Sequence, residues 1–257
     1  MSPQRFQSTG ENSFFGNFVY DRVVPRGHFL RRLRELIPWE RFSQKLLAYY
    51  TGGAQEGRPP YDPALLLRML LLASLYNLSE RQTEQMVNEN IPMKFFVGVA
   101  VDEKAPDHST LTAFKARLKA NGREKAFEEL LQEILQMGRE KGIVFGSVQV
   151  VDSVHTEANV DPGREEERKR EGEEPRDPGA RWGAKGRRRV RTEGGETKEV
   201  TEYFYGYKAH VSLNAATGLI TSVVPTAGNV PDGKVLPQLV EKDLEQGLPV
   251  RVVSGDR

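Results

Sequence analysis

The hydrophobic period of the sequence changes once, near Gly146, and this change constrains the fold more than any other feature. Before it, apolar residues recur every three or four positions, which is the spacing of amphipathic helices. After it, short valine-rich runs alternate with turn residues, which is typical of strands. The chain of 257 residues is therefore expected to have an all-helical part over 15–145 and a mixed α/β part over 146–257.

Capping signals mark the helices of the first part. Asp62-Pro63 predicts a helix start, because an acid caps exposed amides and proline is favoured at the first helical position. A leucine-rich run follows, up to Asn77. Ser79 and Gln82 then predict a capping box for a short polar helix. Such a pair of helices suggests a helix-turn-helix DNA-binding unit, but its pattern is more common in an ordinary helical bundle.

Further helices are predicted over 28–37, from Ser109 onward and over 123–141. The short polar helix that follows Ser79 exposes Arg81 and Gln85. We interpret these two side chains as candidates for reading DNA bases, if the helix pair is a DNA-binding unit.

The second part is expected to form a mixed sheet. Three strands, a helix and a fourth strand follow one another, over 147–151, 202–213, 219–226, 232–244 and 249–253. A helical crossover after an antiparallel meander predicts that the last strand lies parallel to the first. Asp232 stands at the start of the crossover helix and is interpreted as its N-cap.

Two aspartates are candidate metal ligands because each directly follows a predicted strand. They are Asp152 and Asp256, and parallel neighbouring strands would bring them together. Two close carboxylates repel unless a cation lies between them, and a site of hard oxygen ligands favours Mg²⁺ or Mn²⁺. The alternative is that each aspartate only caps a turn. Because the chain has no cysteine, thiolate ligands and nucleophiles are excluded, and we interpret His28 and His108 as structural.

Charge is unevenly distributed, although 37 Lys+Arg balance 36 Asp+Glu to a net +1. Residues 161–177 are almost free of apolar side chains and are expected to be a solvated loop, or else a short exposed helix. Together with the following residues, they form a charged loop insertion over 161–200. A basic stripe follows within it, made of Arg181, Lys185, Arg187, Arg188, Arg189 and Arg191. This stripe is interpreted either as a solubilising loop or as an arm that contacts DNA phosphates. Trp182 within it is expected to pin the loop, and stacking on an extruded base is the alternative.

Several ordered motifs together resemble bacterial insertion-sequence transposases of the acid-triad (DDE) type. They lie at 57–87, 106–118, 148–160 (VQVVDSVHTEANV), 177–186, 203–232 and 255–257 (GDR). The first part resembles an InsH-like transposase N-terminal domain, and the second resembles the start of an RNase H-like catalytic domain.

The resemblance implies that Asp152 and Asp256 are the first two acids of the triad and bind Mg²⁺ or Mn²⁺. It leaves the third acid, a glutamate on a later helix, without a counterpart, so a truncated catalytic domain that is inactive alone is expected. The implied partners are the terminal inverted repeats of the element, target DNA, and a second copy or a complementing C-terminal fragment. The implied location is the bacterial cytoplasm, at the nucleoid, and no apolar run reaches the roughly 18–20 residues of a membrane span. The alternative is a non-catalytic DNA-binding regulator, or a remnant of a transposase.

Overall fold

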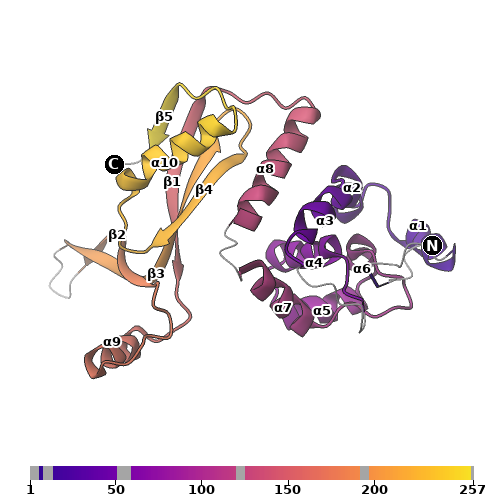
Figure 1. The fold of residues 1–257 in the computed structure, drawn as a ribbon, viewed down its shortest axis with the longest axis horizontal. Helices are drawn as coiled ribbons and strands as arrows, with labels where there is room; N and C mark the ends of the chain where they lie inside the picture. The colour runs from indigo at the N-terminus through magenta and orange to yellow at the C-terminus, as the bar shows by residue number, and fades with distance from the viewer. Residues whose placement is uncertain (1–5, 8–13, 51–58, 120–124, 192–196, 256–257) are drawn as a thin grey trace. The chain divides into compact units, whose positions relative to one another are not determined.

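The computed structural model describes residues 6–7, 14–50, 59–119, 125–191 and 197–255. The chain divides into two compact units, Met1–Leu130 and Leu131–Arg257. Figure 1 shows that helices make up the first unit and that a sheet with its helices makes up the second. In the described residues, none of the helices is long and apolar enough to cross a membrane.

The first unit is helical throughout its described residues. Its elements are α1 (Phe14–Val23), α2 (Phe29–Leu36), α3 (Trp39–Leu47), α4 (Pro63–Leu75), α5 (Glu80–Glu89), α6 (Ile91–Val97), α7 (His108–Lys119) and the first part of α8 (Lys125–Glu140). Fully buried side chains from α4, α6 and α7, including Met69, Phe96 and Phe114, form its core. Burial of such side chains stabilises a domain by about 1.5–3 kcal/mol each.

The capping signals of α4 and α5 are confirmed. The Asp62 side chain accepts a hydrogen bond from the Ala64 amide at 2.8 Å. Ser79 and Gln82 form the complete capping box, in which each side chain bonds the backbone of the other residue. Between the two helices, Asn77 adopts a left-handed φ of 52°, which ends α4 because few other side chains tolerate that conformation.

The second unit is built on a five-stranded mixed sheet. Its elements are β1 (Val148–Glu157), α9 (Pro162–Glu171), β2 (Arg181–Arg191), β3 (Thr197–Asn214), β4 (Ile220–Ala227), α10 (Asp232–Glu245) and β5 (Val252–Gly255). β3 pairs antiparallel with β1 and with β4, and β5 pairs parallel with β1. The predicted meander, crossover helix and parallel last strand are therefore confirmed, and the arrangement is consistent with an RNase H-like domain.

β3, with 18 residues, is the longest strand described, and it changes partners at Gly206. Its first half pairs with β2, and its second half pairs with β1 and β4. Gly206 lies opposite both Arg181 and Glu157. A Cβ built on Gly206 would lie 2.1 Å from the Thr156 carbonyl oxygen, so only glycine fits where the ladders meet.

The expectation of a loop over 161–200 is wrong, and the alternative of a short exposed helix is confirmed for its first part. Its first part is helix α9, and its second part is a two-stranded ribbon made by β2 and the first half of β3. The helix forms because Asp161 caps it, accepting from the Gly163 amide at 2.9 Å, with Pro162 behind the cap and Gly172 in a left-handed conformation at its end. These local signals outweigh the lack of apolar residues.

The two faces of the sheet differ. On one face, α10 packs Val235 and Leu239 against Val224, with Val151 beside them. On the other face, large apolar side chains are exposed, namely Val148, Val150, Val154, Ile220 and Val252. The second part of α8 belongs to this unit, because Leu135 packs against Phe145 and Leu248.

Candidate active site and nucleic-acid interface

Asp152 lies inside β1 rather than after it. The strand was expected to end at Asp152, but it runs on to Glu157, and Asp152 pairs with Val211 of β3. The hydrogen bonds of this pairing continue the ladder, so the prediction of a strand end is wrong. The alternative role of Asp152 as a turn cap fails for the same reason.

What ends beside Asp152 is the pairing of β1 with β5. The parallel register runs from Val148–Val252 to Val151–Gly255. The residue that follows each member of the last pair in the sequence is an aspartate, Asp152 or Asp256. Asp256 lies outside the described residues.

The Asp152 carboxylate emerges on the exposed face of the sheet. Val151 packs toward α10, and successive strand residues point to opposite faces, so Asp152 points away from α10. One carboxylate oxygen accepts a hydrogen bond from the Ser153 amide at 2.7 Å. An exposed carboxylate held by a backbone amide is a hard oxygen donor, and its chemistry fits a divalent cation such as Mg²⁺ or Mn²⁺.

Asp232 is not the N-cap of α10, as the sequence suggested. The N-cap is Pro231, which makes no side-chain cap. The Asp232 carboxylate instead bonds Lys208 Nζ at 2.9 Å and Ser153 Oγ at 3.0 Å, and it lies 3.4 Å from Nδ1 of His210. Lys208 and His210 lie two positions apart on β3, and their nitrogen atoms both lie close to Asp232 Oδ1. The carboxylate therefore interacts with these side chains and does not cap α10.

Opposing effects set the pKa values of this group. Burial raises the pKa of Asp232. Hydrogen bonds from Lys208 and Ser153 and the nearby positive charge lower this pKa by more than burial raises it, so it lies below its ordinary value. Burial lowers the pKa of His210, which Asp232 opposes and Lys208 reinforces. His210 is therefore neutral at pH 7, and its Nε2 lies 2.9 Å from the Thr226 hydroxyl.

The basic stripe at 181–191 lies on β2, in the ribbon with β3. Within the described parts of this ribbon, 181–191 and 197–206, the sequence has seven cations and two acids. Arg188 pairs with Glu202 at 3.0 Å and Arg189 with Glu199 at 3.5 Å, and both arginines stay largely exposed. The other exposed cations on β2 are Arg181, Lys185 and Arg191, and Arg187 is placed only by its pairing with Thr201.

Trp182 connects the ribbon to α9. Its Nε1 donates to Glu166 Oε1 at 2.9 Å, and its ring meets Tyr205 edge to face at a centroid distance of 5.5 Å. The side chain is 45% exposed. These contacts agree with the expectation that Trp182 pins this segment.

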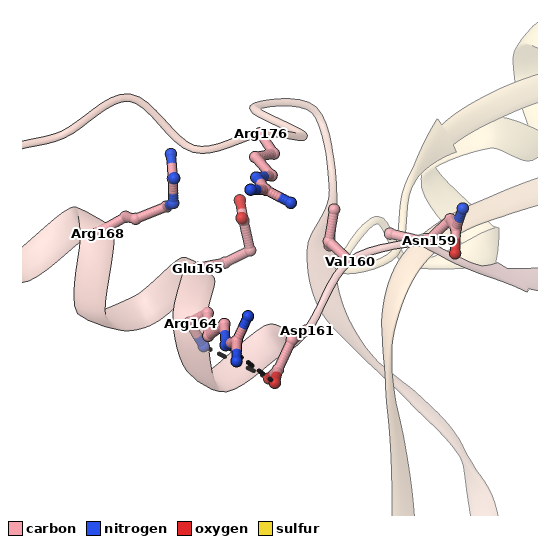
Figure 2. A pocket seen from close by; sticks show the side chains of 8 residues that line it. Asn159, Val160, Asp161, Arg164, Glu165, Arg168 and Arg176 are labelled. Atoms are coloured by element: carbon pink, nitrogen blue, oxygen red, sulfur yellow. Dashed lines mark hydrogen bonds and ion pairs between the residues drawn. The ribbon is translucent and has the colours of Figure 1, made fainter.

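A cavity of about 400 Å³ lies between α9 and the segment before it (Figure 2). Arg164, Arg168 and Arg176 line it together with two acids, Asp161 and Glu165. Figure 2 shows the Glu165 carboxylate pointing toward Arg176, and the Asp177 amide donates to Glu165 Oε2 at 3.4 Å. The two acids offset much of the charge of the three arginines. The contact of Glu165 with the Asp177 amide connects α9 to the chain that follows it, and we assign no ligand to the cavity.

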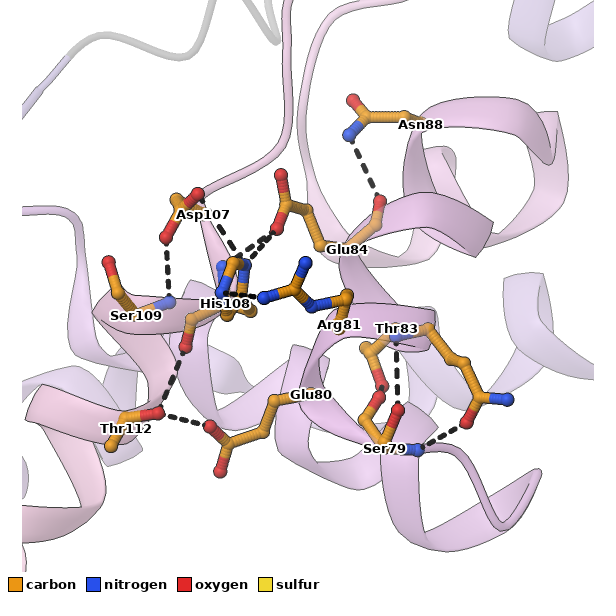
Figure 3. Close-up of polar contacts among 11 residues, drawn as sticks. Ser79, Glu80, Arg81, Thr83, Glu84, Asn88, Asp107, His108, Ser109 and Thr112 are labelled. Carbon is orange, nitrogen blue, oxygen red and sulfur yellow. Dashed lines mark hydrogen bonds and ion pairs between the residues drawn. The ribbon is translucent and has the colours of Figure 1, made fainter.

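In the helical unit, the two candidate base-reading side chains are exposed on α5. The guanidinium of Arg81 lies 3.4 Å from Nε2 of His108, and Gln85 donates to Glu89 at 3.1 Å. Figure 3 shows that Arg81 is part of a polar network between α5 and α7. Base reading by these residues remains a prediction, and Arg81 would have to leave His108 to reach DNA.

The same network contains three groups with ligand atoms within 4.8 Å of one another, Glu84, Asp107 and His108. Glu84 Oε2 accepts from the His108 amide at 2.9 Å and lies 2.7 Å from its Nδ1. Glu84 thus bonds both the backbone and the ring of His108, the first residue of α7. These contacts connect α5 to the start of α7 and support the structural interpretation of His108. Glu84 could not be identified from the sequence as the partner of His108, because it comes from another helix, α5. His28 is likewise structural, because its Nδ1 accepts from the Leu30 amide at 3.2 Å as the cap of α2.

Comparison with known protein families matches both units. A transposase domain (DUF772) family matches residues 18–117, and a transposase DDE domain family matches residues 145–257. No solved structure matches the chain. The two matches cover the helical unit and the sheet on which Asp152 lies, in the order expected of a single class of protein.

The chain belongs to the DDE-type insertion-sequence transposases. Its function is that of a transposase, and the family implies that it acts on DNA with divalent metal ions. The first domain family covers α2 to α6 and most of α1 and α7, and the second covers β1 to β5.

Proposed function

We propose that Asp152 and Asp256 are two of the catalytic acids and that they bind Mg²⁺ or Mn²⁺ for cleavage and transfer of DNA strands. The observation that carries this proposal is the parallel register of β1 and β5, which ends at Val151–Gly255, one residue before each aspartate. Strand ends of neighbouring parallel strands are where α/β folds place functional groups.

The chain's own contribution is to present an oxygen ligand on a rigid strand. Asp152 pairs with Val211 of β3, and the residue before it, Val151, also pairs with Gly255 of β5. If Asp152 held a divalent ion, the ion would supply stabilisation of the charge on a transferring phosphate and activation of the attacking hydroxyl.

Cleavage of DNA that carries the terminal inverted repeats of the element tests this proposal. With Mg²⁺ and a complementing C-terminal fragment that supplies the third acid, we expect strand cleavage that Asp152→Ala abolishes and that Glu241→Gln, an exposed acid on α10, leaves unchanged. Binding of the repeats without cleavage by this mixture would contradict a catalytic role and favour a DNA-binding regulator.

We also propose that the ribbon of β2 and β3 contacts DNA through Arg181, Lys185, Arg187, Arg188, Arg189 and Arg191. A two-stranded ribbon has the width to enter the major groove, and cations along it replace the counterions of the phosphates. Arg81 and Gln85 are proposed as base contacts of the helical unit. Loss of preference for the terminal repeats in Arg81→Ala and Gln85→Ala would support that role, and an unchanged preference would contradict it.

A second copy of the chain is the proposed protein partner. The exposed valines and isoleucine on the sheet face opposite α10 form an apolar surface, and such surfaces favour association.

A further inference from the structure

Ser153 is the neighbour of Asp152 on β1, and the two side chains leave the strand on opposite faces. On the face of Ser153, the hydroxyl donates to Asp232 Oδ2 at 3.0 Å. On the other side, the Ser153 amide donates to Asp152 Oδ1 at 2.7 Å. One residue therefore bonds both carboxylates, from its side chain and from its backbone.

Asp232 is itself firmly placed. It is the first residue of α10, and α10 is anchored to the sheet by Leu239, which is fully buried, and by Val235. Lys208 Nζ bonds the other carboxylate oxygen at 2.9 Å, with a side chain that is only 15% exposed. The buried ring of His210 lies 3.4 Å from the same oxygen.

The face on which Asp152 emerges offers little packing by comparison. The neighbours of Asp152 on that face of β1 are Val150, which is 40% exposed, and Val154, which is 59% exposed. Packing against other side chains therefore does little to fix the Asp152 side chain. Order in this part of β1 has to come from the backbone ladder and from the contacts of Ser153 on the opposite face.

We propose that Asp232 is a positioning residue, which holds Ser153 from α10 and thereby fixes the carboxylate of Asp152 in the orientation that binds the divalent ion. This inference rests on the proposed metal-binding role of Asp152. Mutation of a residue that orients a metal ligand typically lowers the affinity for the metal by about 10- to 100-fold. Asp232 does not touch the ion in this scheme and acts only through Ser153.

Binding of Mn²⁺ alone, followed by electron paramagnetic resonance, tests the inference without requiring activity. Ser153→Ala removes the hydroxyl that reaches Asp232, and we expect it to weaken Mn²⁺ binding by about tenfold. Ser153→Thr keeps the hydroxyl and should restore the affinity of the unchanged chain. Asp232→Ala should match Ser153→Ala, and adding it to Ser153→Ala should cause little further loss.

Ser212→Ala is the matched control. Ser212 Oγ donates to Asp243 Oδ2 at 2.5 Å, which also ties α10 to the sheet, but through β3 instead of β1. Thermal unfolding should show a loss of stability in both serine variants, with weaker Mn²⁺ binding only in Ser153→Ala. Equal Mn²⁺ affinities in the two variants would overturn the positioning role and leave Asp232 with a purely structural one.

Asp152→Asn in the same titration separates this inference from the proposed function. If Asp152→Asn weakens Mn²⁺ binding and Ser153→Ala does not, only the positioning role fails. If Asp152→Asn has no effect, the proposed metal site itself is wrong.

Discussion

Single residues at the junction of the strands decide whether this sheet can form. Gly206 is the point at which β3 leaves β2 and joins β1 and β4. Gly183 and Gly228 lie at the same junction, because a Cβ on Gly183 would lie 2.2 Å from the Gly228 carbonyl oxygen. The backbones approach so closely here that no side chain fits, which the sequence did not indicate because glycines also mark ordinary turns.

Gly206→Ala is expected to destabilise the second unit by about 3 kcal/mol, because a methyl group would overlap the backbone of β1 and force the strands apart. Chemical denaturation measures the change. Gly233→Ala is the control, since no atom lies within 4 Å of its Cβ position, and it should change the free energy of unfolding by less than about 1 kcal/mol. A similar small effect at both sites would contradict the close approach.

The buried ring of His210 should make stability depend on pH. Burial holds the pKa of the folded state below the ordinary value of 6.5, so the unfolded chain binds a proton that the folded chain does not. The free energy of unfolding should therefore fall as the pH drops below about 6.5, until the folded ring is protonated too. Asp232, whose pKa is lowered, adds a loss only at a more acidic pH, below its ordinary value of 3.8.

Denaturation curves between pH 7 and pH 5 measure this effect. In His210→Gln the decline over this range should be smaller, because the titrating ring is gone. An equal decline in the variant would show that other groups cause it.

At the scale of elements, the sequence predicts most helices and the pairing of the first and last strands, but it predicts α9 only as an alternative and does not predict the ribbon of β2 and β3. The caps of α4 and α5 and the crossover α10 follow from spacing over a few residues, and the sequence predicted them. The ribbon was missed because its cations hide the strand alternation, and strand pairing depends on a partner far along the chain. The sequence predicts an end of β1 at Asp152 that is too early, because a polar residue inside a strand looks like a strand end when the partner strand is unknown.

The ribbon should contribute to DNA binding through its charge. Arg189 and Arg191 lie two positions apart on β2, so both leave the same face of the ribbon. Replacing both with alanine should weaken binding and lower the slope of log K against log salt by about 2, if each contacts one phosphate. Fluorescence anisotropy at several salt concentrations measures the slope.

Lys234→Ala with Arg251→Ala is the matched control, because it removes the same charge from exposed positions of the second unit outside the ribbon. Its slope should stay close to that of the unchanged chain. Equal slopes for the two double variants would mean that net charge, and not the ribbon, decides DNA affinity.

At the scale of the whole molecule, the second unit carries an apolar sheet face that α10 does not cover. Val154 is 59% exposed on this face and Val252 is 53% exposed. Exposed apolar surface of this kind favours association over a monomer in water. The valine-rich strands are visible in the sequence, but only the strand register shows which side chains share this face.

Val150→Thr with Val154→Thr should reduce self-association of the chain, because threonine keeps the shape and the strand propensity of valine but has a hydroxyl in place of one methyl group. Light scattering after size-exclusion chromatography measures the molar mass. Val144→Thr, at a position that is 83% exposed before β1, should leave the mass unchanged. If the double variant associates as much as the unchanged chain, this face is not the contact.

Titration with Mn²⁺ under electron paramagnetic resonance tests the central claim most directly, since the claim is that Asp152 and Asp256 hold a divalent ion where the pairing of β1 with β5 ends. The account predicts that Asp152→Asn and Asp256→Asn each weaken Mn²⁺ binding at least about tenfold, while Glu241→Gln binds as the unchanged chain does. Undiminished binding in the two aspartate variants would contradict the assignment of the site.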